Sequence, residues 1–105
     1  MNRNKVLDDI LTLKPVLKKE GITLLGVFGS YGRGDYTASS DVDILYDIDN
    51  PKEFAKKNGG FAAFSKLELL KEMIANKIGK KIDFVAQRGL NSISEKYVMQ
   101  DLVRV

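Results

Sequence analysis

Two aspartates, Asp41 and Asp43, stand one residue apart at the start of the segment SDVDILYDI (residues 40–48). The segment is rich in Val, Ile and Leu, which is typical of a β-strand. Alternate residues of a strand lie on one face, so both carboxylates are expected to project together while Val42 and Ile44 face the core. Two like charges this close repel unless a positive charge lies between them. The pair therefore predicts a strand with one core face and one charged face.

The remaining apolar patterns predict alternating helices and strands in a small α/β (α+β) fold with helices covering a sheet. The predicted helices cover residues 4–21, 61–79 and 91–105, and the further strands cover residues 22–28 and 80–86. Residues 31–36 are expected to form a short helix or turn, and Pro15 predicts a kink or break in the first helix. Residues 49–60, rich in Asn, Lys and Gly, are expected to form a surface loop.

Several apolar side chains of the later helices are expected to pack inward. They are Phe61, Phe64, Leu67, Leu70, Ile74 and Ile78 in the helix over residues 61–79, and Ile93, Tyr97 and Leu102 near the C-terminus. Asn91 or Ser92 is the expected cap of the last helix, with Glu95 in its first turn.

The composition limits the chemistry that is open to this chain. Its 105 residues fit a single domain over residues 1–105, and it contains neither cysteine nor histidine. Disulfides, thiolate nucleophiles, histidine bases and Cys/His zinc sites are therefore excluded. The net charge of +3 suits anionic ligands such as phosphates but is too small to argue for nucleic-acid binding. No apolar run is long enough for a membrane span and the N-terminus does not resemble a signal peptide, so a cytoplasmic location is expected.

A third acid, Asp83, stands in the short apolar segment KKIDFVA (residues 80–86). A charge in such a strand is costly to bury unless it is paired or bound to a metal. If this strand lies beside residues 40–48, three carboxylates gather at one place. Ligation by oxygen alone suits Mg²⁺ or Mn²⁺, and such ions support phosphoryl and nucleotidyl transfer.

The turn after residues 22–28 offers groups that suit a phosphate. Gly29 lacks a Cβ, so backbone N–H groups can approach an anion closely, and Ser30 adds a hydroxyl donor. Arg33 is a candidate for a charge-assisted contact with a phosphate oxygen. Asp35 is expected to brace the turn. The sequence fits neither a P-loop, which needs Lys and Ser/Thr after its last glycine, nor a dinucleotide-binding G-x-G-x-x-G fingerprint.

The pattern formed by these residues resembles that of the DNA-polymerase-β-like nucleotidyltransferase superfamily. It consists of Gly29-Ser30, Arg33-Gly34-Asp35, Ser40-Asp41-Val42-Asp43 and Asp83. The small size resembles the minimal nucleotidyltransferase (MNT) branch, the antitoxins of HEPN–MNT toxin–antitoxin pairs. The resemblance implies a small mixed sheet of the nucleotidyltransferase type. One departure is Gly32, where the family often has Ala, and glycine there is expected to loosen the short helix by up to about 1 kcal/mol.

The resemblance also implies roles for individual residues. Asp41 and Asp43 would bind Mg²⁺, and Asp83 would complete the catalytic and metal-binding triad. The nucleotide would be held by Gly29, Ser30, Arg33 and Ser40. The implied reaction moves AMP from ATP to a hydroxyl, and in the antitoxin branch the acceptor is a tyrosine of the partner HEPN toxin.

Two other functions remain open from the sequence. The protein could neutralise a partner by binding alone, or it could modify a small molecule as antibiotic nucleotidyltransferases do. Direct binding of nucleic acid is not expected, because the sequence shows no helix-turn-helix and no aromatic-basic surface.

Overall fold

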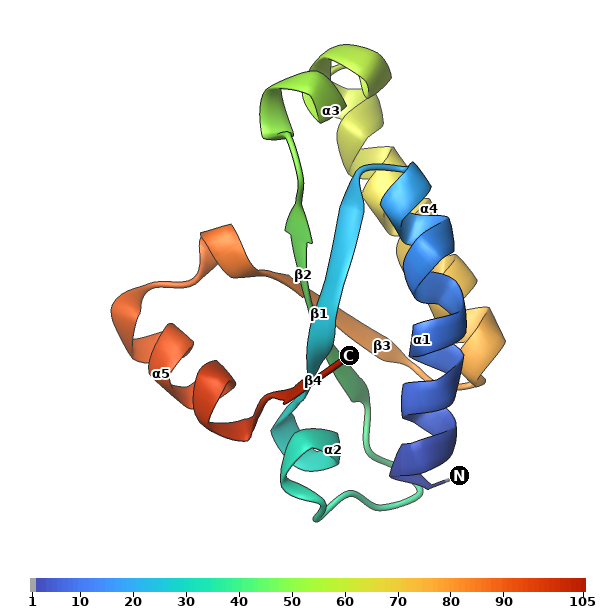
Figure 1. Cartoon of the computed structure of the whole chain (residues 1–105), viewed down its shortest axis with the longest axis vertical. Helices are drawn as coiled ribbons and strands as arrows, with labels where there is room; N and C mark the ends of the chain where they lie inside the picture. The colour runs from blue at the N-terminus through green and yellow to red at the C-terminus, as the bar shows by residue number, and fades with distance from the viewer. Residues whose placement is uncertain (1) are drawn as a thin grey trace.

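A mixed four-stranded sheet, with strand order β3-β2-β1-β4, carries the helices of this protein (Figure 1). It is seen in a computed structural model that describes residues 2–105. In chain order the elements are α1 (Arg3–Lys19), β1 (Ile22–Phe28), α2 (Gly29–Arg33), β2 (Val42–Ile48), α3 (Pro51–Asn58), α4 (Gly60–Ile78), β3 (Ile82–Ala86), the 3-10 helix η1 (Gln87–Gly89), α5 (Ser92–Asp101) and β4 (Val103–Arg104). The predicted fold class is confirmed.

Strand β2 lies between β1, its antiparallel neighbour, and β3, its parallel neighbour. A parallel pair needs a long crossover, and here α3 and α4 provide it. Figure 1 shows α1 and α4 side by side on one side of the sheet and α5 on the other. The register sets Phe28 opposite Asp43 and Asp43 opposite Asp83, so these residues meet near one end of the sheet.

The hydrophobic core lies between the sheet and the pair α1 and α4. From β2 it takes Val42, Ile44 and Tyr46, whereas Asp43 between them stays half-buried outside it. The other fully or mostly buried core residues include Val6, Ile10, Leu13, Leu17, Ile22, Leu24, Val27, Leu70, Ile74, Ile78 and Ile82. The alternation along β2 therefore sends its acids to the face opposite α1 and α4, as the sequence predicts.

Helix α1 continues through Pro15 without a break. Proline removes the N–H that would donate to the carbonyl of Leu11. Both residues lie on the exposed side of the helix, where water can hydrate that carbonyl. The predicted break is absent because the lost hydrogen bond lies on the solvent-exposed side of the helix.

The predicted loop over residues 49–60 is wrong, because most of it forms α3. The Asn50 side chain accepts a 3.0 Å hydrogen bond from the Glu53 N–H, and Pro51 occupies the first turn. Phe54 is buried and anchors the helix, which ends at Gly59 with φ +77°. Eight residues with one buried aromatic are too few to give a periodic apolar pattern.

The prediction that Phe61 and Phe64 belong to the core is also wrong. Their exposed fractions are 86% and 62%, whereas Leu70, Ile74 and Ile78 of the same helix are buried. Figure 1 shows that the first turns of α4 lie with α3 beyond the end of the sheet. These turns have no sheet to cover, so periodicity alone assigned them wrongly.

The C-terminal segment differs from the predicted single helix. Helix α5 is capped by Asn91, which accepts a 2.8 Å hydrogen bond from the Ser94 N–H, and it ends at Asp101. Ile93 and Tyr97, predicted to pack inward, are 71% and 67% exposed, and Val98 is buried instead. The last residues form β4, a strand of two residues that the sequence did not predict.

Strand β4 fits against β1 because β1 carries a glycine where the two backbones meet. A Cβ on Gly26 would lie 2.3 Å from the Val103 carbonyl oxygen. No side chain fits at that distance, so Gly26 gives β4 its place at the sheet edge. Within residues 2–105 no helix combines the length and the apolar character needed to cross a bilayer.

We expect the substitution Gly26→Ala to lower the free energy of unfolding by about 1–3 kcal/mol, the usual cost of overpacking. Gly89→Ala is the matched control, because a Cβ there meets no atom within 4 Å and should change stability by less than about 0.5 kcal/mol. Urea titration followed by circular dichroism measures both. Equal midpoints for Gly26→Ala and the wild type would contradict the close approach of β4.

Candidate active site

Two of the predicted site acids face each other across neighbouring strands. Asp43 of β2 and Asp83 of β3 are partners in the parallel register, so their backbones lie about 4.8 Å apart. Asp43 is half-buried and Asp83 is exposed. Residues in register share a face, so both carboxylates lie on the side of the sheet away from α1 and α4.

Asp41, the third predicted acid, lies just before β2. Its Oδ2 atom is 3.9 Å from Nζ of Lys81, in an ion pair whose two side chains are 47% and 81% exposed. Such an exposed and distant pair contributes little to stability. Asp41 is therefore only loosely held, close to the other two acids.

Asp43 lies close enough to the other two carboxylates for their charges to affect its pKa. Burial raises the pKa of Asp43 above its ordinary value, and the negative charges of Asp83 and Asp41 raise it further. The positive charge of Arg33 opposes this rise. A carboxylate that is partly desolvated and crowded by like charges favours a bound cation, which would relieve both costs.

The residues present fit a divalent metal ion, although their side chains are not arranged as a cage. Among residues 2–105, no group of three or more acidic side chains is oriented to hold a metal. Oxygen donors alone suit Mg²⁺ or Mn²⁺. Asp41, Asp43 and Asp83 would hold such an ion, and Asp41 would first have to leave Lys81.

Gly29, predicted to let a phosphate approach, lies directly against an acid. A Cβ built on Gly29 would be 2.0 Å from Oδ2 of Asp43, and its φ is +64°. In this structure the space beside Gly29 is taken by the Asp43 carboxylate. Gly29 thus leaves room for the Asp43 carboxylate, in addition to any role toward a phosphate.

Ser30 lies in α2, the five-residue helix that begins at Gly29. Its carbonyl oxygen accepts hydrogen bonds from the N–H groups of Gly34, at 2.9 Å, and Asp35, at 3.1 Å. These bonds close the short helix and hold Ser30 in its first turn. Ser30 is thus held next to Gly29, the residue that lies against Asp43.

Ser40 shapes the loop that leads into the acids. Its Oγ accepts a 2.8 Å hydrogen bond from the Thr37 N–H, and its own N–H donates to the Thr37 carbonyl at 3.1 Å. In this structure Ser40 braces a turn one residue before Asp41. Its predicted role toward the nucleotide stays a prediction.

Arg33, a predicted phosphate contact, binds two carboxylates. Its Nε donates to Asp35 at 3.1 Å and its Nη1 donates to Asp101 at 2.9 Å, and the Nη2 group takes part in neither bond. Asp35 thus braces this turn, as predicted. Sequence analysis missed Asp101, because 68 positions separate it from Arg33 and no local pattern marks it.

Gly32 has a packing role that the resemblance did not indicate. A Cβ at this position would lie 2.1 Å from the Asp101 carbonyl oxygen. The glycine therefore lets α2 pack against the end of α5. The expectation that it merely loosens the helix omitted this contact.

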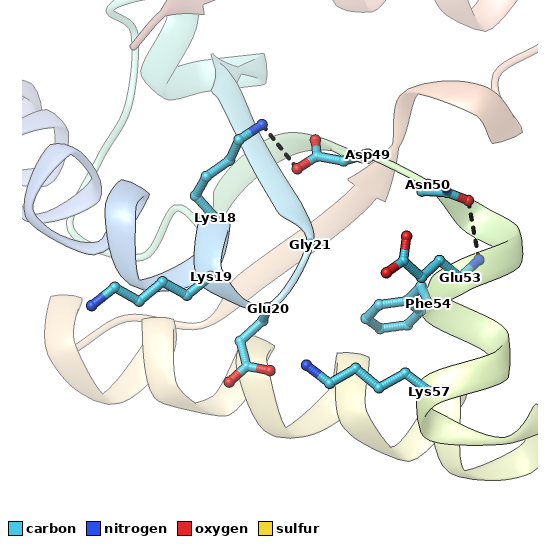
Figure 2. A pocket seen from close by; sticks show the side chains of 9 residues that line it. All are labelled: Lys18, Lys19, Glu20, Gly21, Asp49, Asn50, Glu53, Phe54 and Lys57. Carbon is cyan, nitrogen blue, oxygen red and sulfur yellow. Dashed lines mark hydrogen bonds and ion pairs between the residues drawn. The ribbon is translucent and has the colours of Figure 1, made fainter.

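A pocket of about 200 Å³ lies at the other end of the sheet (Figure 2). Asp49 and Asn50 in its wall follow the end of β2, whereas the acids mark the start of that strand. Figure 2 shows Lys18 reaching Asp49, an ion pair of 2.8 Å that lowers the pKa of Asp49. Lys18 and Asp49 in its wall pair with each other, and Glu20 pairs with Lys66 of α4. None of the predicted site residues lines this pocket.

Comparison with known proteins identifies the family. The sequence model described as "Nucleotidyltransferase domain" matches residues 10–103. The chain belongs to the nucleotidyltransferase family. Protein adenylyltransferase MntA of Thermococcus cleftensis is 34% identical over 101 residues, which cover 94% of this chain and 92% of that protein. A Methanocaldococcus jannaschii protein, assigned as a protein adenylyltransferase, is 30% identical over 94 residues, covering 88% and 86% of the two chains.

Solved structures support the same fold. A structure assigned to the minimal nucleotidyltransferases has a TM-score of 0.72 at 20% identity and covers 100% of this chain and 97% of that one. A chain from a crystal structure of a toxin–antitoxin with AMP-PNP has a TM-score of 0.62 at 20% identity, covering 99% and 72% of the two chains. The small mixed sheet of this nucleotidyltransferase is thus the sheet of its family.

We expect Asp43→Asn to raise the melting temperature of the nucleotidyltransferase at pH 7. The pKa of Asp43 is higher in the folded protein than in the unfolded chain, so ionised Asp43 costs stability at neutral pH. The advantage of Asn should shrink as the pH falls through the raised pKa, and it should vanish below about 4, where Asp43 is protonated in both states.

Thermal melts at a series of pH values measure this effect, and Mg²⁺ should stabilise the wild type but not Asp43→Asn. Asp47→Asn is the control, because Asp47 pairs with Arg88 at 2.9 Å and gains nothing from losing its charge. A lower melting temperature for Asp43→Asn at pH 7 would contradict the crowding of the acids.

We expect Gly29→Ala to lower nucleotidyl transfer by about 100-fold, since its Cβ displaces the Asp43 carboxylate. Gly34→Ala is a close control. Its φ of +90° imposes comparable backbone strain, but its Cβ would meet only Nη1 of Arg3, at 3.7 Å. Both variants should lose similar stability, and only Gly29→Ala should lose most of its turnover. Equal activities would show that the contact with Asp43 does not matter.

Proposed function

We propose that this nucleotidyltransferase is a protein adenylyltransferase and an antitoxin, which moves AMP from ATP to a tyrosine hydroxyl of a partner HEPN toxin. The adenylyltransferase name of the Thermococcus relative supports the reaction, and the toxin–antitoxin neighbour with AMP-PNP supports the nucleotide and the kind of partner. The observation that carries the proposal is the contact between Gly29 and Asp43 beside Asp83.

In the proposed reaction the acceptor oxygen attacks the α-phosphorus of ATP. A new oxygen–phosphorus bond forms, the bond to the β-phosphate oxygen breaks, and pyrophosphate leaves. A bound Mg²⁺ or Mn²⁺ would neutralise charge on the phosphates. In this scheme the exposed carboxylate of Asp83 takes the proton of the acceptor hydroxyl, while Ser30 and the backbone beside Gly29 hold the phosphates.

The exposure of the acids suits an acceptor that belongs to another protein. Asp41 and Asp83 are exposed at the open face of the sheet. A hydroxyl on a partner can therefore reach them, and the partner surface can exclude water from the reaction. The Nη2 group of Arg33, which bonds neither Asp35 nor Asp101, can donate to a phosphate oxygen while Nη1 stays bonded to Asp101.

A second function, neutralisation by binding alone, is favoured by one observation. The three acids are not oriented as a metal cage among residues 2–105, and Asp41 is turned toward Lys81. In that case the complex with the toxin would form and silence it without transfer of AMP.

Labelling with radioactive ATP separates the two functions. We expect label from α-³²P-ATP, but not from γ-³²P-ATP, to appear on a HEPN protein encoded beside this gene, and EDTA should prevent it. Asp41→Ala combined with Asp43→Ala should abolish the label. Asp47→Ala is the control on the same face of β2 and should keep it.

The toxin's activity is measured in the same samples. Toxin silenced equally by the wild type and by the double variant, with no label in either, would establish neutralisation by binding. Label that survives in the double variant would contradict the roles of the two acids.

A further inference from the structure

We propose that Asp101 is a positioning residue for the nucleotide site, which holds α2 so that the Gly29–Ser30 turn keeps its place against β2. This inference rests on the proposed function. Asp101 is far from the motif in sequence and touches none of the predicted catalytic acids, but it contacts two consecutive residues of α2, Gly32 and Arg33.

The first contact is an ion pair between side chains. Oδ2 of Asp101 accepts from Nη1 of Arg33 at 2.9 Å, and the Asp101 side chain is only 19% exposed. Asp35, the other partner of Arg33, is 62% exposed and lies two positions away in the chain. Solvent screens the exposed pair with Asp35 more strongly than the less exposed pair with Asp101.

The second contact is made by the main chain. The Asp101 carbonyl oxygen lies so close to Gly32 that a Cβ there would be 2.1 Å away. The side chain and the carbonyl of Asp101 therefore fix two neighbouring points of α2. A five-residue helix has little internal rigidity, so its orientation depends on such outside contacts.

Asp101 can act as a brace because the chain on its C-terminal side is tied to the sheet. Val103 and Arg104 pair with β1, and the Val105 N–H donates to the Leu25 carbonyl at 3.1 Å. Nζ of Lys14 in α1 donates to the Val105 carbonyl at 2.8 Å. These bonds make the end of α5 a fixed reference point for α2.

The position of α2 in turn sets the position of the nucleotide turn. Ser30 and Arg33 lie within the same turn of helix, and the Ser30 carbonyl is bonded to the Gly34 N–H. A shift of Arg33 would therefore be passed on to Ser30, and it would change the close contact between Gly29 and the Asp43 carboxylate. Asp101 thus controls the site without touching the nucleotide or the reacting atoms.

The test compares Asp101→Asn with Asp35→Asn, since each variant removes one charged partner of Arg33. We expect Asp101→Asn to weaken binding of AMP-PNP about tenfold and to raise the KM for ATP similarly, the effect of one charge-assisted hydrogen bond. The kcat should change much less than the KM. Asp35→Asn should change either quantity less than about threefold. Asp101→Glu should restore part of the affinity, because it restores the charge.

Two further measurements separate positioning from general destabilisation. In the free protein, hydrogen exchange should become faster for the amides of residues 30–34 in Asp101→Asn, and not for residues 22–28 of β1. In a variant that already carries Arg33→Gln, Asp101→Asn should cause little additional loss of AMP-PNP affinity, because the two residues act through one contact.

Unchanged exchange at residues 30–34 in Asp101→Asn, or an undiminished additional loss of affinity in the Arg33→Gln background, would overturn the role of Asp101. A wild type that binds no AMP-PNP and transfers no label would overturn the proposed function instead, and the exchange measurement would still decide whether Asp101 positions α2.

Discussion

The division of β2 into two faces is the constraint on which the rest of this structure depends. Val42, Ile44 and Tyr46 must be buried against α1 and α4, and this alternation forces Asp43 to the opposite face. Pairing with β1 then brings Gly29 against Asp43, and pairing with β3 brings Asp83 beside it. The hydrophobic effect on one face of the strand thus assembles a cluster of like charges on the other.

That cluster opposes stability, and the surrounding structure limits the cost. The half-buried Asp43 is crowded by two other acids, whereas the exposure of Asp41 and Asp83 leaves their charges in water. The missing Cβ of Gly29 leaves room for the Asp43 carboxylate. Acids that are partly desolvated and crowded by like charges are typical of functional sites, where proteins sacrifice stability for function.

The sequence predicted local features of the candidate site, whose binding and catalytic roles stay predictions. The spacing of Asp41 and Asp43 and the turn at Gly29 and Ser30 each lie within a few residues, where chain geometry fixes the relation. Prediction from the sequence failed where tertiary packing determines the structure. The exposed Phe61 shows that an apolar periodicity does not say where the sheet ends, and α3 shows that a cap and one anchor can form a helix without a pattern.

By itself, the sequence determined the family, the mixed α/β fold and the acids that form the candidate site, because strand alternation and turn chemistry act between near neighbours. Only the tertiary structure decided that Asp83 is the register partner of Asp43 and that Asp41 is turned toward Lys81. It also decided that Asp101 forms an ion pair with Arg33 of α2. These contacts join residues that are tens of positions apart. They depend on strand order and on backbone approach, which no local pattern encodes.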